Sequence, residues 1–589
     1  MTSLVDTADV VVWGGGTGAA AASIQSARCG ASTLLLTPGA WLGGMVSAAG
    51  VCCPDGNELT PWQTGLWGAF LRELDHREVD GLDHNWVSCF GYRPSIAEAI
   101  LQDWVRAEPH LIWWSGCRLL GVERDGGVLN AVRVEIDGEQ RRIGCRVVID
   151  GSDRGDLLPL AEAPYRFGWE ARELWNEPSA PVRARLESEQ FFRDQPVQSP
   201  TWVVMGQLQG DRLPRDAGVA PDSTVSPQLT SPFQRACEAF GLERTITYGR
   251  LPGGLVMINW PLHGNDWHRE LLRGFDNGGQ QEAELFADMQ SHSLRFAEAL
   301  RDASDGWLDL GDAFPAQSGS PTPWLAAMPY WREGRRMVGR STVIEQHLLP
   351  ESDGASMAPL PRDETGELQS IAVGNYANDH HYPGEDWPLA PKSCRWGGRW
   401  TGTPFTIPYG ALISSDIDNL LTADKAFSTS HMANGATRLQ PLILNIGQAA
   451  GAAAGLSVSS GMHPSELPVR LLQQQLISDP IAPSAVVPLW DTPWHHSQWR
   501  NRQTSALEQR ELSRASPQTS ASGDEVSGVI HPDRQGGFHF EARNGERSPL
   551  ITLEPAVNAL LQDLTGPTSV TLRAEHNPWG PWRRVTAVL

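Results

Sequence analysis

The feature that most constrains the fold is a glycine-rich turn near the start of the chain. An apolar run, Val10–Trp13, leads into Gly14-Gly15-Gly16-Thr17-Gly18-Ala19, and a stretch of small residues, Ala20–Ile24, follows. This order predicts a strand, a tight turn and a helix, with free amides at the helix start that favour an anion such as a pyrophosphate. A glycine-rich loop without a ligand is the alternative, and the flanking strand and helix argue against it.

Two further strand ends extend this interpretation. The strand predicted at residues 32–36 ends at Thr37, where dinucleotide-binding proteins normally carry an acidic residue for the ribose. A hydroxyl can still bond the ribose, without the strength of a charged acceptor. The strand at 147–149 runs into Asp150-Gly151, which suits a second cofactor-facing turn. A solvated loop is the alternative there, because these residues are common turn formers.

A second strong pattern lies near residue 441. A predicted strand at 419–423 ends at Asp424, and a helix that begins near Pro441 carries Gly447, Gly451 and Gly455 at four-residue spacing. One helix face is therefore nearly bare. Because alanine would satisfy ordinary core packing, this face predicts close approach to a sheet or to a flat ligand surface. The helix start adds partial positive charge.

Composition excludes several classes of protein. The chain has 589 residues, 40% of them hydrophobic, and a net charge of −22. It is long enough for two or three domains, and its charge disfavours nucleic acids and anionic membranes as partners. We expect no membrane span, no metal site and a cytoplasmic location. The eight cysteines show no C-x-x-C spacing, so we expect reduced thiols.

Three segments taken together resemble the FAD-dependent oxidoreductase family, within the larger group of glutathione-reductase-like flavoproteins. They are 14–45 with Trp41-Leu42-Gly43-Gly44, 150–173, and 419–455. Shorter matches lie at 251–266 and 330–336. The fragments follow the order of the family over roughly residues 8–475, which makes the resemblance more specific than the glycine motif alone.

The resemblance implies an α/β fold, with a Rossmann-like FAD-binding domain that is interrupted by an inserted, mostly β, substrate domain. We place the first part of the FAD-binding domain at 1–165, the substrate domain at 166–395 and the second FAD-binding part at 396–480. Residues 481–527, which end in a serine-rich stretch, are expected to be a linker. Residues 528–589 alternate like strands around one short helix and predict a small C-terminal α+β or β module.

The resemblance also implies where FAD lies. The glycine-rich turn faces the pyrophosphate, Gly43-Gly44-Met45 passes along the flavin, and Arg118 and Leu119 offer backbone to the adenine. Asp424 meets the ribityl chain, and the next helix, entered through Leu439-Gln440, points at the N1–C2=O edge of the flavin. Family members commonly have Gly-Arg where this chain has Asp424-Lys425.

Oxidation of a substrate at a C–H bond suggests which residues are catalytic. A base must take the proton from the hydroxyl or amine group of the substrate, and histidine has the suitable unperturbed pKa. His380 and His431 are the chosen candidates, with His381 also considered, and a structural role is the alternative for each. Arg438 directly precedes the flavin-facing helix and can bind a substrate carboxylate or stabilise reduced flavin. Its alternative is an ion pair that supports the helix entry. The arginines at 332, 335 and 336 are interpreted as a structural or surface cluster.

We therefore expect an FAD-dependent oxidoreductase that transfers a hydride from a small organic substrate to the flavin. Two alternatives remain. One is an FAD-containing lyase or isomerase that acts on carbohydrate without net redox change. The other is a catalytically inactive binding protein that keeps the FAD fold. The expected partner is a small-molecule substrate, and the sequence leaves the oligomeric state open.

Overall fold

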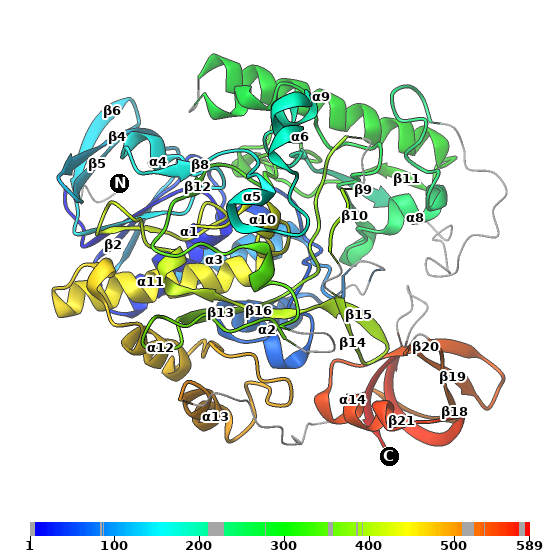
Figure 1. Cartoon of the computed structure of the whole chain (residues 1–589). Coiled ribbons are helices and arrows are strands. Elements are labelled where there is room, and N and C mark those ends of the chain that lie inside the picture. The colour runs from blue at the N-terminus through cyan, green and yellow to red at the C-terminus, as the bar shows by residue number, and fades with distance from the viewer. Residues whose placement is uncertain are drawn as a thin grey trace.

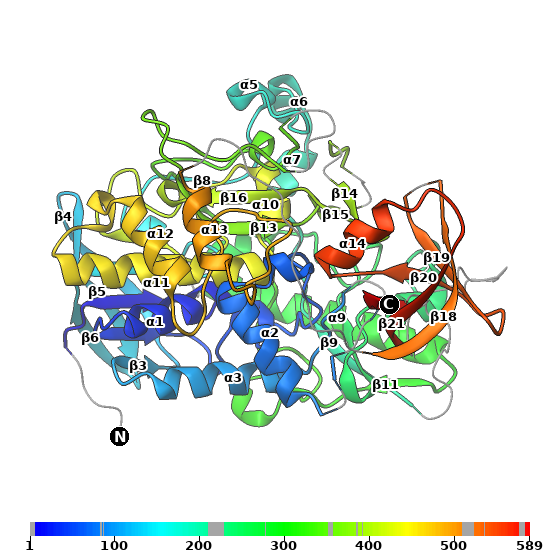
Figure 2. The same ribbon diagram turned by 90° about the horizontal axis from the view of Figure 1, so that it is seen from below.

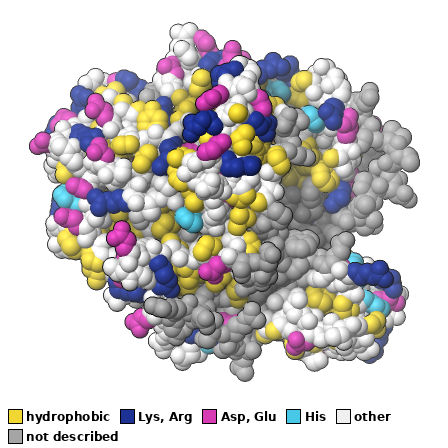
Figure 3. All heavy atoms as spheres, viewed as in Figure 1, with side chains coloured by type: hydrophobic (Ala, Val, Ile, Leu, Met, Phe, Trp, Pro, Cys, Tyr) yellow, Lys and Arg dark blue, Asp and Glu magenta, His cyan; other side chains and the backbone are white. Residues whose placement is uncertain are grey.

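The computed structural model gives the fold of most of the chain. It describes residues 6–79, 81–82, 85, 88–209, 229–276, 279–351, 357–383, 387–390, 393–508, 523–534, 536–576 and 583–589. Figure 1 shows a large body with the N-terminal core on one side and the C-terminal module projecting at the other end. Acidic and basic side chains are interspersed over the face shown in Figure 3.

The core is a five-stranded parallel sheet with strand order β17-β7-β1-β2-β3. Its strands are β1 (Val10–Trp13), β2 (Thr33–Leu36), β3 (Leu111–Trp114), β7 (Val147–Asp150) and β17 (Leu420–Thr422). All residues of β1, β2, β7 and β17 are buried, as expected for parallel strands that are covered on both faces. The predicted Rossmann-like α/β class is confirmed.

Two helices from opposite ends of the expected FAD-binding domain pack on each other. They are α1 (Thr17–Arg28) and α11 (Gln440–Ser460), and Figure 2 shows them side by side. A Cβ at Gly447 would lie 2.5 Å from the carbonyl oxygen of Gly18, and one at Gly451 would overlap the carbonyl of Ala22. The bare face of α11 therefore contacts helix backbone. The predicted close approach of this face is confirmed, but its partner is helix α1, where a sheet or a flat ligand surface was expected, and there is no room for a methyl group.

Helix α11 is also apolar along its length. It is the one helix in the described ranges that is long and apolar enough to cross a membrane, and 83% of its most apolar window is buried inside the fold. This burial is that of a core helix. Helices α2 (Gly65–Arg77), α3 (Pro94–Ala107) and α12 (Val469–Ser478) complete the covering of this region.

Smaller elements branch from the core. A three-stranded antiparallel sheet consists of β4 (Arg118–Asp125), β5 (Val128–Ile136) and β6 (Glu139–Gly144). Two short elements follow β7, α4 (Leu157–Leu160) and β8 (Tyr165–Arg166), and β8 pairs with β12 (Arg336–Met337).

The inserted region combines a small sheet with helices. Its antiparallel strands are β9 (Val204–Leu208), β10 (Leu255–Ile258) and β11 (Leu308–Leu310), with β9 in the centre. The long helix α9 (Gln280–Ala303) packs against this sheet. The remaining helices are short: α5 (Arg172–Trp175), α6 (Arg183–Ser188), α7 (Phe191–Asp194) and α8 (Gly241–Thr247).

The chain returns to the core earlier than the expected boundary at residue 396. Strand β13 (Ser370–Asn375) is fully buried, pairs with β16 (Pro404–Pro408) and packs against α11 and α12. A hairpin of β14 (Ser393–Trp396) and β15 (Arg399–Gly402) lies between the two paired strands in sequence. Helix α10 (His431–Thr437) then precedes α11.

The first part of the expected linker at 481–527 is folded. Helix α13 (Trp499–Ala506) packs on α12, and the Gln503 side chain accepts hydrogen bonds from the backbone amides of Val486 and Val487. The serine-rich residues 509–522 lie outside the described residues. The linker expectation is thus wrong for 482–507, where apolar residues are buried against the core.

The C-terminal module is a closed barrel of five strands. They are β18 (Asp524–Pro532), β19 (Phe538–Ala542), β20 (Arg547–Ile551), β21 (Thr568–His576) and β22 (Arg583–Val588), with α14 (Pro555–Gln562) between β20 and β21 in sequence. The module contacts the tip of the β14–β15 hairpin, since the Gly397 amide donates to Asn558 Oδ1 at 2.6 Å and the Thr552 amide to the Gly397 carbonyl at 3.1 Å.

Candidate functional site

The glycine-rich turn is pressed against the ends of two neighbouring strands. Gly14 has a φ of +128°, and a Cβ there would lie 2.5 Å from the backbone of Gly151. A Cβ at Gly16 would lie 2.5 Å from Asp424 Oδ2. Side chains would force the turn away from β7 and β17. The backbone amides of Gly15 and Gly16 have no hydrogen-bond partner among the described residues, so they are available to an anion.

The loop predicted to pass along the flavin lies on this turn. Thr17 Oγ1 donates to the Gly43 carbonyl at 2.7 Å, and a Cβ at Gly44 would lie 2.8 Å from the Cα of Gly16. Gly43 and Gly44 have φ values of +98° and +52°, a conformation that favours glycine. Met45 is fully buried. The two predicted cofactor segments are therefore in contact, and the residues of this backbone cradle fit the predicted FAD diphosphate.

Asp424 is a buried acid at the start of α1. Its Oδ2 accepts a hydrogen bond from the Gly18 amide at 2.7 Å, and Lys425 Nζ lies 3.2 Å from its Oδ1. Lys425 also pairs with Asp153. Burial raises the pKa of Asp153 to about 6 although Lys425 lowers it. Burial opposes the charge of Lys425, but its two carboxylate partners outweigh that effect and raise its pKa.

Four other predicted cofactor contacts are held by protein groups or lie away from the turn. Thr37 Oγ1 donates to the Gly39 carbonyl at 2.8 Å and accepts from Trp113 Nε1 at 3.0 Å. The Asp150 carboxylate accepts from Ser152 and from the Leu157 amide, and burial raises its pKa to about 7. Arg118 and Leu119 begin β4, where the exposed Arg118 side chain pairs with Glu135 at 2.6 Å. Their contacts to a cofactor stay predictions.

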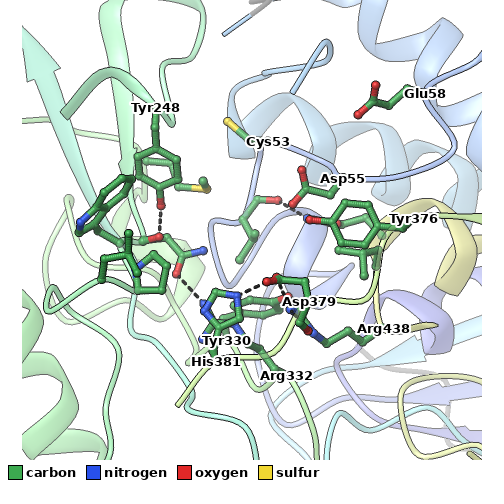
Figure 4. A pocket seen from close by; sticks show the side chains of 18 of the residues that line it. Cys53, Asp55, Glu58, Tyr248, Tyr330, Arg332, Tyr376, Asp379, His381 and Arg438 are labelled. Atoms are coloured by element: carbon green, nitrogen blue, oxygen red, sulfur yellow. Dashed lines mark hydrogen bonds and ion pairs between the residues drawn. The ribbon is translucent and has the colours of Figure 1, made fainter. Parts of the chain in front are cut away.

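A cavity of about 370 Å³ opens at the start of α11 (Figure 4). It lies between the FAD-binding region and the inserted region and contains three predicted residues, Arg438, Leu439 and Gln440. The residues that line it are Val51, Cys53, Asp55, Glu58, Phe240, Tyr248, Met257, Asn259, Trp260, Pro261, Leu262, Tyr330, Arg332, Tyr376, Asp379, His381, Arg438, Leu439 and Gln440.

Five charged or ionisable side chains form a continuous chain along this cavity, which we call the cavity chain: Arg332, Asp266, His381, Asp379 and Arg438. Arg332 Nη1 lies 3.0 Å from Asp266 Oδ1, and Arg438 Nη2 lies 2.9 Å from Asp379 Oδ2. Between the two acids, His381 Nδ1 is 3.1 Å from Asp266 Oδ2 and Nε2 is 2.8 Å from Asp379 Oδ2. A neutral imidazole can donate to one of these acids, whereas a protonated imidazole donates to both.

The acids of the cavity chain are held ionised. Burial alone would raise the pKa of Asp266 and Asp379, but neighbouring arginine and histidine side chains outweigh it and lower both. For Asp266 these neighbours are Arg332 and His381, and for Asp379 they are His381 and Arg438. Arg438 Nη1 also donates to the Tyr330 hydroxyl at 2.6 Å.

Several donors and acceptors at the cavity lack a protein partner. Arg438 Nε, Arg332 Nε and Gln440 Oε1 are buried and make no hydrogen bond within the described part of the chain. Unsatisfied buried polar atoms cost about 1–3 kcal/mol each, so a cavity that carries three of them suits a polar ligand.

His380 and His431 lie in a separate group, the buried histidine cluster, which we define as Glu333, His380, Tyr382 and His431. His431 Nδ1 is 2.9 Å from Glu333 Oε1 and Nε2 is 2.6 Å from the Tyr382 hydroxyl. His380 Nδ1 is 2.8 Å from the same hydroxyl, and Nε2 is 3.1 Å from the Met432 carbonyl. Neither histidine is among the cavity-lining residues. Burial lowers the pKa of His380 to about 3 and that of His431 well below its usual value.

Arg336 holds this cluster from the other side. Its guanidinium, which is fully buried, lies 3.0 Å from Glu333 Oε1 and 2.9 Å from Glu170 Oε1. Burial raises the pKa of Glu333 to about 7 although Arg336 lowers it. Arg336 is thus part of a buried ion-pair cluster, as expected. Arg332 is likewise buried in an ion pair, with Asp266, and it also lines the cavity.

The sequence reasoning missed Tyr330 and Asp379 as cavity-lining residues, and Asp266 as the acid that pairs with the lining residues Arg332 and His381. The signal for Asp379 was its place beside two histidines, and Asp266 and Tyr330 stand in the short matches at 251–266 and 330–336. Within the described ranges, no group of three or more His, Cys, Asp or Glu side chains could hold a metal ion.

Comparison with known structures gives distant likenesses. The flavin-dependent brominase Bmp2 is 10% identical, with 79% of this chain and 83% of that chain covered and a TM-score of 0.35. A geranylgeranyl bacteriochlorophyll reductase-like protein from Thermoplasma acidophilum is 10% identical, with 86% and 88% covered and a TM-score of 0.32. The chain spans 26% of the length of Aquifex aeolicus GidA, at 18% identity and a TM-score of 0.19, and 23% of that of L-proline dehydrogenase from P. horikoshii.

Comparison by sequence is more decisive. No curated protein matches the chain. The model of the family described as FAD dependent oxidoreductase, however, matches residues 9–476. These residues include the parallel sheet, the glycine-rich turn, the inserted region and all residues that line the first cavity. The chain therefore belongs to the FAD dependent oxidoreductase family, and it is an enzyme of that kind with FAD as its cofactor.

Proposed function

We propose that the cavity at the start of α11 is the substrate site, and that the enzyme transfers a hydride from a small organic substrate to the flavin. The observation that carries the proposal is the position of Arg438. It directly precedes the predicted flavin-facing helix and lines the cavity, and its Nε is buried without a partner among the described residues. FAD, when bound, supplies the two-electron acceptor.

The unpartnered atoms define the substrate class. Arg438 Nε and Arg332 Nε are donors that need an acceptor such as a carboxylate or carbonyl oxygen, and Gln440 Oε1 is an acceptor that needs a hydroxyl or amine proton. A hydroxy acid or an amino acid carries both kinds of group. The cavity volume of about 370 Å³ suits a molecule of that size.

We assign the proton transfer to the Asp379–His381 pair in place of His380 and His431. Oxidation of an alcohol or amine carbon releases a proton from the attached oxygen or nitrogen, and a side chain in the cavity must accept it. The Asp379 side chain is 41% exposed, so a substrate can reach it, and its Oδ2 lies 2.8 Å from His381 Nε2, to which it can pass the proton. His431 is 1% exposed and has protein partners on both ring nitrogens.

Anaerobic mixing tests this function. The FAD-loaded enzyme is mixed with a panel of small hydroxy acids and amino acids, and flavin absorbance is followed. We expect at least one compound to bleach the flavin. Conversion of a carbohydrate without any bleaching at any time would instead support the lyase or isomerase alternative. Tight FAD binding with no reaction and no bound compound would support the inactive binding protein.

The cofactor site has its own test at Gly15. A Cβ there meets the Pro38 ring at 3.8 Å, which is ordinary contact, whereas a Cβ at Gly16 meets backbone and Asp424. Gly15→Val therefore alters the lining of the proposed diphosphate cradle while the turn keeps its packing. We expect the purified variant to retain its fold, judged by circular dichroism, and to lose most of its flavin. Full flavin content would contradict the placement of the diphosphate.

A further inference from the structure

A second cavity, of about 230 Å³, lies in the inserted region. Helix α9 supplies His292 and Arg295, which are three residues apart and share one helix face. The segment after β10 supplies Trp267, His268 and Arg269. Pro261 is the one described lining residue that this cavity shares with the proposed substrate site, so the arginines and histidines of the second cavity belong to it alone.

The second cavity carries uncompensated positive charge. Arg269 and Arg295 form no ion pair with any described residue, whereas the nearby Arg273 pairs with Glu270 and Asp288. Asp266 is the one carboxylate among the described lining residues, and its two oxygens are occupied by Arg332 and His381. Two arginines that line one cavity and have no ion-pair partner of their own among the described residues attract an anion.

The histidines of this cavity add hydrogen-bonding groups without adding charge at neutral pH. Burial lowers the pKa of His268 to about 4 and also lowers that of His292. His268 Nδ1 is 2.6 Å from Ser199 Oγ, and its Nε2 makes no hydrogen bond to a described residue. His292 Nε2 lies 3.2 Å from the Gly264 carbonyl, so this nitrogen carries the proton. The Nε2 of His268 is thus left for a ligand.

The remaining walls are apolar. The ring of His292 packs against Phe233 at a centroid distance of 5.1 Å and against Trp267 at 5.5 Å. Pro232 and Pro383 also line the cavity. Rings and proline side chains beside two arginines provide for a ligand with a charged head and a compact apolar body.

We propose that the second cavity is a binding site for a small organic anion, a carboxylate or a phosphate ester attached to a ring or a short apolar group. Arg269 and Arg295 hold the anionic head, and Phe233 and Trp267 contact the body. None of the residues at the start of α11 lines this cavity, so the site is distinct from the proposed substrate site. It therefore does not depend on which substrate the first cavity oxidises.

Calorimetric titration of the FAD-loaded protein tests the site. The probes are benzoate, phenyl phosphate and benzamide, which share a ring and differ in the charge of the head group. We expect one or both anions to bind and benzamide not to bind, and comparison of the two anions distinguishes a carboxylate site from a phosphate site. Equal binding of benzamide, or no binding of either anion, would overturn the proposal.

Variants locate the binding. Arg269→Gln combined with Arg295→Gln should lower the affinity for the anion by about tenfold or more. Arg301→Gln removes a positive charge from the same helix outside the cavity and should leave affinity unchanged. Both arginines of the cavity are exposed, so the double variant should fold, which its melting temperature checks. Unchanged affinity in the double variant, or loss of affinity in Arg438→Met, would place the anion elsewhere and overturn the proposal.

Discussion

The cavity chain and the buried histidine cluster contain the same kinds of side chain and differ in what reaches them. The cavity chain joins a histidine to a carboxylate and an arginine within hydrogen-bonding distance, and so does the buried histidine cluster together with Arg336. In the cavity chain Asp379 is 41% exposed, whereas in the cluster Glu333 and His431 are at most 1% exposed. Access therefore decides which set can exchange a proton with a substrate, and the sealed set stabilises the junction of α10 with the inserted region.

The largest expected effect on stability comes from removing Arg336, which pairs with the buried histidine cluster. Arg336→Met leaves Glu170 and Glu333 buried without their cation, which should lower the free energy of unfolding by about 3–5 kcal/mol. Denaturant unfolding of the FAD-loaded enzyme measures it. The control is Arg340→Met, which removes a pair with Asp418 in which both side chains are more than 40% exposed and should cost less than about 1 kcal/mol. Equal losses in the two variants would contradict the assignment.

Loss of Arg438 from the cavity chain should lower turnover. Arg438→Met removes a charged donor from the cavity, and we expect kcat/KM to fall about 10- to 100-fold with flavin content unchanged. Arg438→Lys should recover only part of the rate, because an ammonium lacks the planar fork of donors. Stopped-flow flavin reduction gives the rate, and a wild-type rate in Arg438→Met would remove this residue from the site.

A matched pair of histidine variants sharpens the comparison. His381→Gln should lower kcat/KM about tenfold and change its pH profile, with little change in melting temperature. His431→Gln should leave kcat close to that of the wild type and lower stability by about 1–3 kcal/mol, since its partners Glu333 and Tyr382 are buried. If His431→Gln lowered kcat/KM and His381→Gln lowered only stability, the catalytic role would belong to His431.

The smallest effect concerns pH. Glu177 accepts from Ser430, the residue before His431, and burial raises the pKa of Glu177 to about 7 from an ordinary value of 4.5. The folded state holds this proton more tightly than the unfolded state, so the stabilising contribution is complete below pH 4.5 and is lost as the pH rises to 7. Glu177→Gln should flatten the fall of stability between pH 5 and 7 by an amount on the order of 1 kcal/mol. The exposed Glu173→Gln should retain the wild-type slope.

The parallel sheet was predictable because its strands are short apolar runs that end in small or acidic residues. Val10–Trp13 and Val147–Asp150 carry this pattern directly. Helix α9 was not singled out, since its charged residues obscure the apolar stripe that packs on β9 and β11. The early return at β13 was missed for a related reason, because nothing in the run Ser370–Asn375 indicates its partner β16, which follows about 30 residues later.

The cavity could be predicted only in part. Arg438 was found because its place before a helix is readable from the sequence. His380 and His381 are adjacent in an extended segment, where neighbouring side chains point in opposite directions, and here one points into the buried cluster and the other into the cavity. Sequence alone does not say which. Asp266 lies 115 positions from His381, so only the tertiary fold brings the two together.

Because α1 and α11 pack with their backbones in contact, the amount of bound flavin should report how closely the two helices pack. Gly451 lies far along α11 from the nucleotide turn, yet a methyl group there would collide with the carbonyl of Ala22 and push apart two helices that both begin at the cofactor cradle. Gly451→Ala should therefore cause loss of bound flavin, seen as loss of the yellow colour, before it unfolds the chain.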